Sequence, residues 1–376
     1  MTRPLEIPAM PNVHSHAFQR GLRGVGERPA PEAHAQDDFW SWRESMYELA
    51  GRLDPVSMHE LGLRVYAEMA AAGYGVVGEF HYVHHQPDGT PYEDPNEMAK
   101  ALALAAEQRG LEIVLLPAAY HRAGWSGTDV PPSAGQRRFC DPSVEAFLAR
   151  VGELRGWAAA RAGVTVGVAA HSVRAVPADW LEAIARYADA HALVRHVHAQ
   201  EQPRELAECR AEHGCTPIEL LARTGFLSSA TTLVHAIHVS DADIELIASS
   251  GSVVASCPTT EGNLGDGVFP AMRYRDAGVP IALGSDSQVI IDPFEEAREL
   301  ETLARRERCT RHALLAANED LWGSLVSAGH TSLGLHASAA ARRVSIDLDH
   351  PRLAGVEERD AHLAIVTCAS AEVLLD

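Results

Sequence analysis

Two histidines separated by one residue are the first pair in the chain that could do chemistry, in the segment Asn12-Val-His14-Ser-His16. Residues 10–16 are expected to form a β-strand. Alternate side chains of a strand share a face, so His14 and His16 point the same way. Two imidazoles placed like this can chelate one metal ion. The pair alone is weak evidence, because two unrelated polar residues at a strand end would give the same pattern.

Histidine and carboxylate residues recur at the ends of three later predicted strands, which strengthens this interpretation. His198 ends the fifth predicted strand and is followed by Glu201, His235 ends the sixth with His238 close behind, and Asp286 follows the eighth. In a barrel of parallel strands these carboxyl ends form one rim, where barrel enzymes keep their active sites. Three imidazoles and one carboxylate suit Zn²⁺, or Fe²⁺, with an open position for water, whose pKa the metal lowers towards about 7.

The residues beside the predicted ligands have separate expected roles. Glu201, three residues beyond His198, is placed to carry protons, although a solvated carboxylate at the start of the next helix would look the same. His235 could ligate the metal or hydrogen-bond the reacting water, and His238 is a weaker candidate. A second metal in such a barrel usually needs a carboxylated lysine at a strand end. Lys100 is the only lysine and lies in a predicted helix, so a mononuclear centre is expected.

The elements that must position these residues are strands and helices in alternation. Short runs rich in β-branched residues alternate with longer segments of helical period, the pattern of repeated βα units around a parallel sheet. The predicted strands are 10–16, 75–80, 111–117, 164–170, 193–199, 230–236, 252–257 and 279–284. The predicted helices include 54–72, 95–109, 143–161, 177–191, 203–222 and 293–308. Eight strands with helices between them predict an α/β fold, a closed (β/α)₈ TIM-type barrel. No G-x-G-x-x-G follows the first strand, which argues against a dinucleotide-binding sheet.

The barrel is expected to span residues 8–330. Two stretches inside it, 21–42 and 121–140, are longer than plain connectors and are expected to be binding loops or lids. Residues 1–7 and 331–376 are expected to be the remnant of a small β-rich domain. Strand-like pieces in the second of these segments lie at 343–348, 362–367 and 372–375.

Composition limits the function classes. The chain has 376 residues, a net charge of -19 and 46% hydrophobic residues, which is enough for a large core. The acidic balance argues against a general affinity for nucleic acid or anionic membranes, and an anionic substrate would need a locally basic site. Six scattered cysteines without a C-x-x-C pair fit reduced thiols, and neither a secretory leader pattern nor a membrane-length apolar run is present. A cytoplasmic protein is therefore expected.

Longer motifs around these residues resemble a known family. The segments are Asn12-Val-His-Ser-His-Ala-Phe-Gln-Arg20, Phe39-Trp-Ser-Trp-Arg-Glu-Ser-Met-Tyr47, Glu79-Phe-His-Tyr-Val-His-His85, His171-Ser-Val-Arg-Ala-Val176 and Cys257-Pro-Thr-Thr-Glu-Gly-Asn-Leu-Gly-Asp-Gly267. With the ligand pattern, they make the chain similar to the mononuclear deaminase branch of the amidohydrolase superfamily, whose members are metal-dependent hydrolases built on (β/α)₈ barrels. Within that branch the chain resembles the formimidoylglutamate deiminase family, over most of residues 10–308. It departs where only nine residues precede the first strand, so the small β domain is expected to be reduced or truncated.

The resemblance implies a ligand set, catalytic residues and a substrate. It implies that one Zn²⁺ per subunit, or Fe²⁺, is bound by His14, His16, His198 and Asp286. It implies that Glu201, His235 and Asp286 are catalytic, with Glu201 shuttling protons and His235 orienting the attacking hydroxide. It assigns substrate recognition to Gln19, Arg43, Tyr82, His171 and Arg174. The implied reaction, in histidine degradation, is hydrolysis of N-formimidoyl-L-glutamate to N-formyl-L-glutamate and ammonia by metal-activated hydroxide.

The substrate assignment also has a physical basis. A small dianionic substrate needs planar bidentate donors, and Arg43 and Arg174 lie in strand-end or loop segments where such donors could face the barrel mouth. Arg43 could instead be a surface arginine stacked on Trp40 or Trp42, and Tyr82 could be a core tyrosine with a bonded hydroxyl.

Other polar and glycine residues in these motifs carry no predicted role. His81, His84 and His85 are expected to lie in a polar loop rather than to act as extra ligands. The glycines at 262, 265 and 267 lack the Lys-Ser/Thr end of a phosphate loop and are expected to form a turn-rich loop after the seventh strand.

Two alternatives remain open. A deaminase of a purine, pyrimidine or other cyclic amidine would share the metal ligands but present an apolar or aromatic pocket to a flat ring. A non-catalytic, metal-dependent binding protein on a degenerate barrel would bind its ligand without turnover. The expected partner is the small substrate, with no nucleic acid or membrane, and a homodimer is the oligomer considered.

Overall fold

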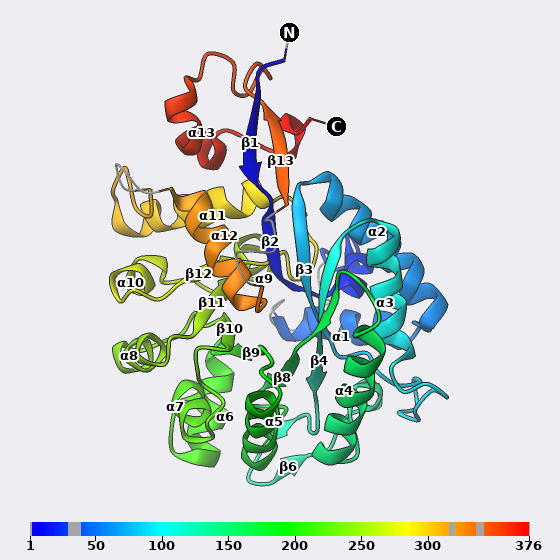
Figure 1. Ribbon diagram of the computed structural model, residues 1–376. Coiled ribbons are helices and arrows are strands. Elements are labelled where there is room, and N and C mark those ends of the chain that lie inside the picture. Colours follow the sequence, from blue (N-terminus) through cyan, green and yellow to red (C-terminus); the bar gives the residue numbers. More distant parts are fainter. Residues whose placement is uncertain (1, 29–38, 316–319, 336–341, 376) are drawn as a thin grey trace.

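Parallel strands in a closed ring form the centre of the molecule (Figure 1). The structure, a computed structural model, describes residues 2–28, 39–315, 320–335 and 342–375. The strands hydrogen-bond in the order β2, β3, β4, β8, β9, β10, β11, β12, and β7 also pairs with β4. Their bounds are β2 Met10–Ser15, β3 Tyr74–His81, β4 Glu112–Ala119, β7 Val164–Val166, β8 Val168–Ser172, β9 Arg195–Ala199, β10 Thr231–His235, β11 Val253–Ser256 and β12 Ile281–Leu283. A parallel bridge between Ser15 and Asp286 joins the two ends of this path, so the sheet closes into a barrel.

All eight predicted strands are confirmed, and the (β/α)₈ barrel with them. The predicted strand 164–170 consists of two pieces, β7 and β8, on either side of Gly167. A Cβ atom at Gly167 would lie 2.8 Å from both the Val194 carbonyl oxygen and the Leu116 side chain. The backbone therefore approaches its neighbours here more closely than any residue with a side chain would allow.

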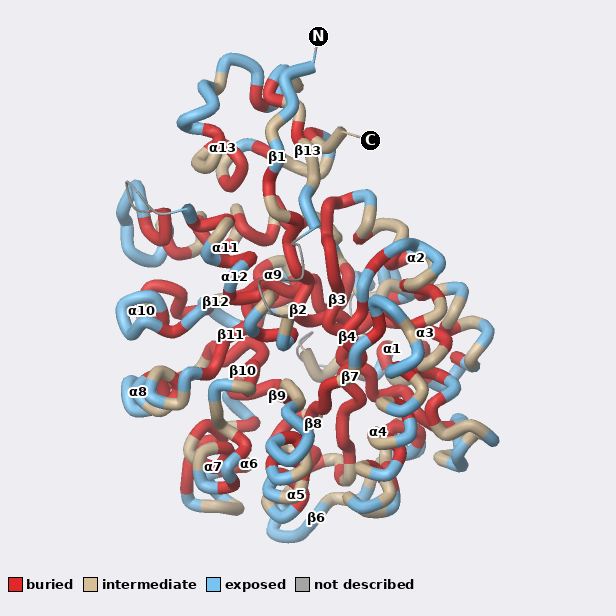
Figure 2. The backbone as a smooth tube through the Cα atoms, viewed as in Figure 1, coloured by how far each residue is buried: buried red, intermediate tan, exposed pale blue. Residues whose placement is uncertain are grey.

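Helices surround the barrel, and the strands inside them are buried almost throughout (Figure 2). The helix bounds are α2 Pro55–Ala71, α3 Glu97–Gln108, α4 Val144–Ala158, α5 Ala178–Ala190, α6 Pro203–His213, α7 Pro217–Arg223, α8 Asp241–Ser250, α9 Pro258–Leu264, α10 Ala271–Asp276, α11 Pro293–Arg308 and α12 Leu321–Ser332. Helix α2 begins with a capping box in which the Asp54 carboxylate accepts from the Ser57 amide and the Ser57 hydroxyl accepts from the Asp54 amide. Pro55 follows at the first helical position, as the start signal in the sequence predicts.

The predicted helix 203–222 is wrong as a single element. It is two helices, because Gly214 ends α6 in the left-handed conformation, with φ 67°. Thr216 then caps α7, with Pro217 at its first position. The apolar periodicity continues across this break, which explains why the sequence reads as one helix.

Segments from the two ends of the chain pair beside the barrel (Figure 1). Strand β1, Pro4–Pro8, is antiparallel to β13, Arg343–Asp347, so the predicted strand at 343–348 is confirmed. The strand-like piece predicted at 362–367 is wrong, because this segment is helix α13, Ala361–Thr367. The piece predicted at 372–375 is confirmed in part: it begins in a 3₁₀ turn, Ala371–Val373, but Leu374 forms an antiparallel bridge with Ile346 of β13. The buried residues of α13 recur at helical spacing and face α11 and α12. The proposed division at residues 8 and 330 stays a prediction.

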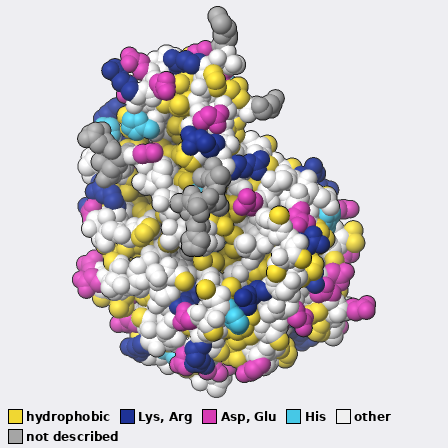
Figure 3. All heavy atoms as spheres, in the orientation of Figure 1, with side chains coloured by type: hydrophobic (Ala, Val, Ile, Leu, Met, Phe, Trp, Pro, Cys, Tyr) yellow, Lys and Arg dark blue, Asp and Glu magenta, His cyan; other side chains and the backbone are white. Residues whose placement is uncertain are grey.

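Short elements cover the rim at the carboxyl ends of the strands. They include a 3₁₀ turn at Ala17–Leu22, helix α1 at Phe39–Ala50, the hairpin of β5 Gly124–Trp125 with β6 Asp129–Val130, and a 3₁₀ turn at Arg137–Phe139. The predicted loop 21–42 lies partly outside the described residues, and the predicted loop 121–140 holds the hairpin. In the described part of the chain, no helix combines the length and apolar character needed to cross a membrane. The face in Figure 3 carries intermingled acidic and basic side chains.

Candidate active site

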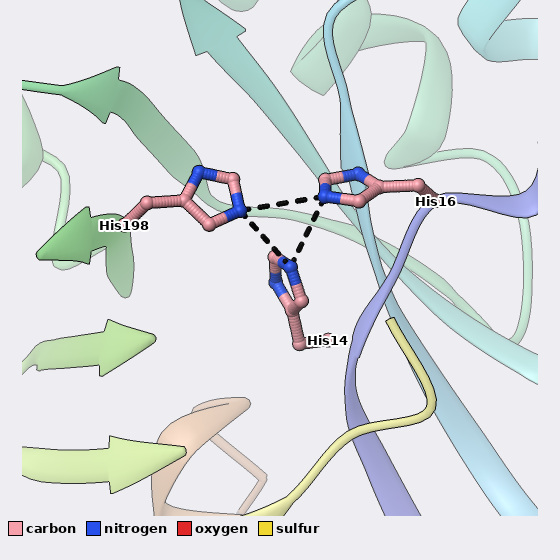
Figure 4. A group of neighbouring side chains, drawn as sticks. All are labelled: His14, His16 and His198. Carbon is pink, nitrogen blue, oxygen red and sulfur yellow. Dashed lines mark hydrogen bonds between the residues drawn. The ribbon is translucent and has the colours of Figure 1, made fainter. Parts of the chain in front are cut away.

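Three imidazoles from two strands meet at the centre of the rim (Figure 4). His14 and His16 lie on β2 and at its end, and His198 lies on β9. Their Nε2 atoms are separated by 3.1 Å (His14 to His16), 3.1 Å (His14 to His198) and 3.4 Å (His16 to His198). Asp286 Oδ1 is 3.5 Å from His14 Nε2 and 3.4 Å from His16 Nε2. The four side chains predicted to bind the metal are therefore brought together.

The hydrogen bonds of these rings direct their lone pairs to a common point. His16 Nδ1 is 2.8 Å from the Phe80 carbonyl oxygen, and His198 Nδ1 is 2.8 Å from the His171 carbonyl oxygen. A carbonyl only accepts, so each Nδ1 carries the proton and each Nε2 is unprotonated. Burial lowers the pKa of His14 to about 3 and the pKa of His198 well below its usual range, so the rings are neutral.

This donor set fits a divalent cation. Converging lone pairs repel one another unless a cation lies between them. Ligand nitrogens about 2.0–2.1 Å from zinc, at tetrahedral angles, are about 3.3–3.4 Å apart, close to the separations seen. Burial alone would raise the pKa of Asp286, but its interactions with His14 and His16 hold that pKa below the usual range, which keeps the carboxylate ionised.

His235 and Glu201 lie against the same point from the other side. His235 Nε2 is 3.7 Å from Glu201 Oε1 and 3.7 Å from Asp286 Oδ2. Burial alone would lower the pKa of His235, but the surrounding carboxylates, Glu201 first, raise it to about 10. Burial raises the pKa of Glu201, against the opposing charge of His235. A carboxylate and an imidazole are thus within reach of whatever molecule lies beside the imidazole cluster.

Backbone strain is concentrated at these strand ends. Gln200, His235, Ala236 and Asp286 all have positive φ, between 47° and 67°, although none is glycine. Hydrogen bonds between neighbouring strand ends hold them there, including Ala236 N to the Ala199 carbonyl and Asp286 N to the His14 carbonyl. Strained residues held in this way are typical of active sites.

A cavity opens above the cluster, and almost every predicted site residue lines it. His14 is fully buried beneath it. The predicted residues in its wall are His16, Gln19, Arg43, Tyr82, His171, Arg174, His198, Glu201, His235 and Asp286. The other residues in the wall are Phe39, Trp40, Trp42, Met46, Tyr47, Tyr120, Phe139, Ser172, Gln202, Glu205 and Leu264. The cavity therefore brings the proposed metal ligands and the proposed substrate-binding residues together.

The family model described as "Amidohydrolase family" matches residues 6–332. The chain belongs to the amidohydrolase family. A protein of Pseudomonas aeruginosa named formimidoylglutamate deiminase is 38% identical over 361 residues, which are 93% of this chain and 78% of that protein. A protein of Halobacterium salinarum named 5-methylthioadenosine/S-adenosylhomocysteine deaminase is 26% identical over 96% of this chain and 77% of its own length.

Solved structures agree with the family. An amidohydrolase from Brucella melitensis has a TM-score of 0.89 and 35% identity to this chain, covering 98% of this chain and 84% of that one. An adenosine deaminase from Xanthomonas campestris with bound zinc has a TM-score of 0.79 at 21% identity, over 99% of this chain and 78% of that one, a likeness of fold alone. This amidohydrolase is therefore a metal-dependent hydrolase that acts on a carbon–nitrogen bond.

Two arginines in the cavity of this amidohydrolase have no carboxylate partner in the part of the chain that the structure describes. Arg174 Nη1 donates to the Ala123 carbonyl oxygen at 2.6 Å, and Arg43 Nη1 is buried without a hydrogen-bond partner. Among the described residues, none offers either guanidinium a carboxylate oxygen within 4.0 Å. The Arg43 guanidinium also lies 4.8 Å from the centre of the Trp40 ring, so the stacking alternative and the cavity position are both observed.

Gln19 and Tyr82 form one polar pair beside these arginines. Gln19 Nε2 donates to the Tyr82 hydroxyl at 2.9 Å, while Gln19 Oε1 is buried without a partner. A half-turn of the amide would let Tyr82 donate to Oε1 and would present Nε2 to an anion. Tyr82 is buried and also lines the cavity, so its place in the core does not remove it from the site.

Some expectations for neighbouring histidines and glycines need correction. His81, His84 and His85 are buried, at 2%, 1% and 2% exposure. His81 ends β3, and His84 and His85 do lie in the following loop, but that loop turns inward against Arg138. None of them lines the cavity. His238 is also outside the cavity wall, with its Nε2 2.8 Å from the Asp266 carbonyl oxygen.

The loop predicted after the seventh strand is partly helical. Its first residues form α9, and Gly265, with φ 69°, ends that helix in the left-handed conformation. Pro258 at the first helical position and a glycine just past the end were the signals for this short helix.

Two buried carboxyl groups near the site were missed from the sequence. Glu205 lies in the cavity wall, and its Oε1 has no hydrogen-bond partner. Burial raises the pKa of Glu205 to about 8, against the lowering effect of Arg174. Glu261 lies behind His235. The available signal for Glu205 was its position four residues after Glu201, near the start of the predicted helix 203–222. The available signal for Glu261 was its place in the Cys257-Pro-Thr-Thr-Glu261 motif.

Proposed function

We propose that this amidohydrolase hydrolyses N-formimidoyl-L-glutamate to N-formyl-L-glutamate and ammonia. The observation that carries the proposal is that Arg43 and Arg174, which have no carboxylate partner among the described residues, share one cavity with the converging imidazoles. A cation that is partly removed from water without a carboxylate beside it is costly, so a site that keeps two such arginines is suited to an anionic ligand. The name of the 38% identical relative supports the same substrate.

The metal would be held by four side chains. His14, His16, His198 and Asp286 would bind one Zn²⁺, with Fe²⁺ as the other candidate, because neutral imidazoles and one ionised carboxylate suit both ions. When bound, the ion lowers the pKa of water towards about 7 and so makes a nucleophile available near neutral pH.

Glu201 and His235 would carry out the proton chemistry. Glu201 accepts a proton from the attacking water while the water oxygen bonds to the formimidoyl carbon, and it passes that proton to the amidine nitrogen. Nε2 of His235, 3.7 Å from Glu201, donates to the new oxygen in the tetrahedral intermediate. Glu201 then moves the second water proton to the same nitrogen, the C–N bond breaks, ammonia leaves and the carbonyl forms.

The two substrate carboxylates would be recognised at the outer part of the cavity. The planar guanidinium groups of Arg174 and Arg43 suit one carboxylate each, since both present paired donors. Gln19, Tyr82 and His171, which line the same wall, would complete these contacts. Several aromatic side chains also line the cavity, and these favour the second candidate, a deaminase of a flat ring such as a purine.

Ammonia release separates the two candidates. We would supply zinc-loaded protein with N-formimidoyl-L-glutamate and, in parallel, with guanine, cytosine and adenosine. We expect release from the glutamate derivative alone, and Arg174→Met should raise its KM about 30-fold or more, since loss of one partner of a buried charge pair costs at least about 2 kcal/mol. The exposed Arg186→Met is the matched control. Release only from a ring substrate would overturn the assignment of both arginines.

A further inference from the structure

A buried carboxylate lies directly behind His235. Glu261, on the first turns of α9, is 2% exposed, and its Oε1 is 3.3 Å from His235 Nδ1. The same oxygen accepts a hydrogen bond from the Cys257 amide at 2.8 Å, and Oε2 accepts one from the Ser256 hydroxyl at 2.9 Å. These two hydrogen bonds prevent the carboxylate from turning away. It is therefore fixed relative to the end of β11 before any substrate binds.

His235 is held between this carboxylate and the reaction centre. Its Nδ1 faces Glu261, and its Nε2 faces Glu201 and Asp286 at 3.7 Å each. The left-handed backbone of His235, with φ 67°, takes its side chain off the regular strand course, so strand geometry alone does not set the direction of the ring. The contact at Nδ1 can set it, together with the stacking of the ring on His198, at 5.6 Å between ring centroids.

We propose that Glu261 is a positioning residue for the reaction, one that acts through His235. The carboxylate accepts the proton on Nδ1, which fixes the plane of the ring, so that the Nε2–H group is directed at the oxygen of the tetrahedral intermediate. The inference deepens the proposed function and rests on it for the identity of the reaction. The loop from Cys257 to Gly267, which had no assigned role in the sequence, thus carries one of the groups that shape the site.

A second cation site is the competing interpretation of the same atoms. His235, Cys257 and Glu261 each offer a ligand atom, and these atoms lie within 4.8 Å of one another. Both carboxylate oxygens of Glu261 already accept hydrogen bonds, and burial raises the pKa of the Cys257 thiol well above its usual range. A neutral thiol and an engaged carboxylate are poor ligands. We therefore expect one metal per chain, in wild type and in Glu261→Gln.

A double-mutant cycle tests the role. Glu261→Gln should lower kcat about 10- to 100-fold, the usual effect of removing such a supporting group, with KM and metal content unchanged. In a His235→Asn background the same substitution should cause no further loss, because its effect passes through His235. An equal loss in both backgrounds, an unchanged kcat in Glu261→Gln, or loss of a second metal ion would overturn the proposal.

Glu296→Gln is the matched control. Glu296 is another buried carboxyl group that holds the same loop, since it accepts from the Thr259 amide at 3.0 Å and from the Thr259 hydroxyl at 2.6 Å. It has no hydrogen bond or ion pair to His235 among the described residues. If Glu261→Gln does not fold, Ser256→Ala removes only the hydroxyl at Oε2. It should lower kcat by a smaller factor, again only when His235 is present.

A spectroscopic readout separates this inference from the proposed substrate. In ¹⁵N-imidazole-labelled protein the Nδ1–H proton of His235, identified by its loss in His235→Asn, should give a hydrogen-bonded NMR signal that is protected from exchange with water. Glu261→Gln should abolish that signal, and Glu296→Gln should keep it. An unaltered signal in Glu261→Gln would overturn the proposal. If wild type releases no ammonia from N-formimidoyl-L-glutamate, the proposed function fails, while the NMR result still decides whether Glu261 orients His235.

Discussion

Ser15 and Asp286 form the bridge that closes the barrel. Asp286 and the two residues that flank Ser15, His14 and His16, are proposed metal ligands. The Asp286 amide donates to the His14 carbonyl oxygen at 3.0 Å, and the His16 amide donates to the Asp286 carbonyl oxygen at 3.0 Å. Three of the four proposed metal ligands therefore belong to, or flank, the residues that join the first strand to the last. The same residues therefore close the barrel and form most of the proposed metal site.

Metal removal should consequently destabilise the fold as well as stop turnover. Without a cation, the three Nε2 lone pairs face one another at 3.1–3.4 Å across the closure. A free zinc concentration about 1,000 times the dissociation constant would add about 4 kcal/mol to the free energy of unfolding. We expect chelation to lower the melting temperature by several degrees and added zinc to restore it, as followed by calorimetry. An identical melting temperature with and without metal would contradict this account of the cluster.

Glu201→Gln should separate metal binding from catalysis. Glu201 is close to His235 but forms no hydrogen bond or ion pair with His14, His16 or His198 among the described residues. The variant should retain the metal content of wild type, measured by atomic emission, while kcat falls about 10²- to 10⁴-fold through loss of the proton carrier. Glu182→Gln, at an exposed position on α5, is the control. Full activity in Glu201→Gln would remove its proposed role.

The sequence predicted the barrel because its strands are apolar and rich in β-branched residues, each followed by a turn signal. The juxtaposition of the proposed ligands was predictable for a related reason: the ends of parallel strands meet at one rim, so His14, His198 and Asp286 could be placed together without knowing side-chain contacts. The break at Gly214 was not predicted, since apolar periodicity continues across it.

Supporting residues were harder to predict than ligands. Glu261, on helix α9, acts on His235, which lies 26 positions earlier on strand β10, and nothing in the local sequence indicates that pairing. The burial of His81, His84 and His85 likewise depends on how the chain turns against Arg138, which comes from a separate loop. Such roles depend on tertiary contacts rather than on spacing.

Glu205 should make substrate binding depend on pH. Burial raises its pKa to about 8, so the carboxyl group is neutral below that pH and ionised above it. An ionised Glu205 in the wall that holds Arg174 would repel a dianionic substrate. KM should therefore rise with pH, by about tenfold between about pH 7 and pH 9.5 if the repulsion is about 1.4 kcal/mol. Steady-state kinetics of Glu205→Gln, which stays neutral, should show a flat KM. The same rise in wild type and variant would assign the effect to another group.

Gly284→Ala should damage the metal site through contact with His14. A Cβ atom at Gly284 would lie 2.8 Å from both the His14 Cβ and the His14 carbonyl oxygen, and 2.9 Å from Cys257 Sγ. Because one of these atoms belongs to the backbone, the strand that carries His14 must shift, and overpacking of this kind costs about 1–3 kcal/mol. We expect a lower melting temperature together with weaker zinc binding, measured by competition with a chromophoric chelator.

Gly156→Ala is the matched control, since its Cβ would meet no atom within 4 Å, and the substitution in helix α4 should add about 0.5–1 kcal/mol of stability. Wild-type zinc affinity in Gly284→Ala would show that zinc binding tolerates a displacement of His14. The proposed metal site would then depend less on the barrel-closing bridge between Ser15 and Asp286 than we infer.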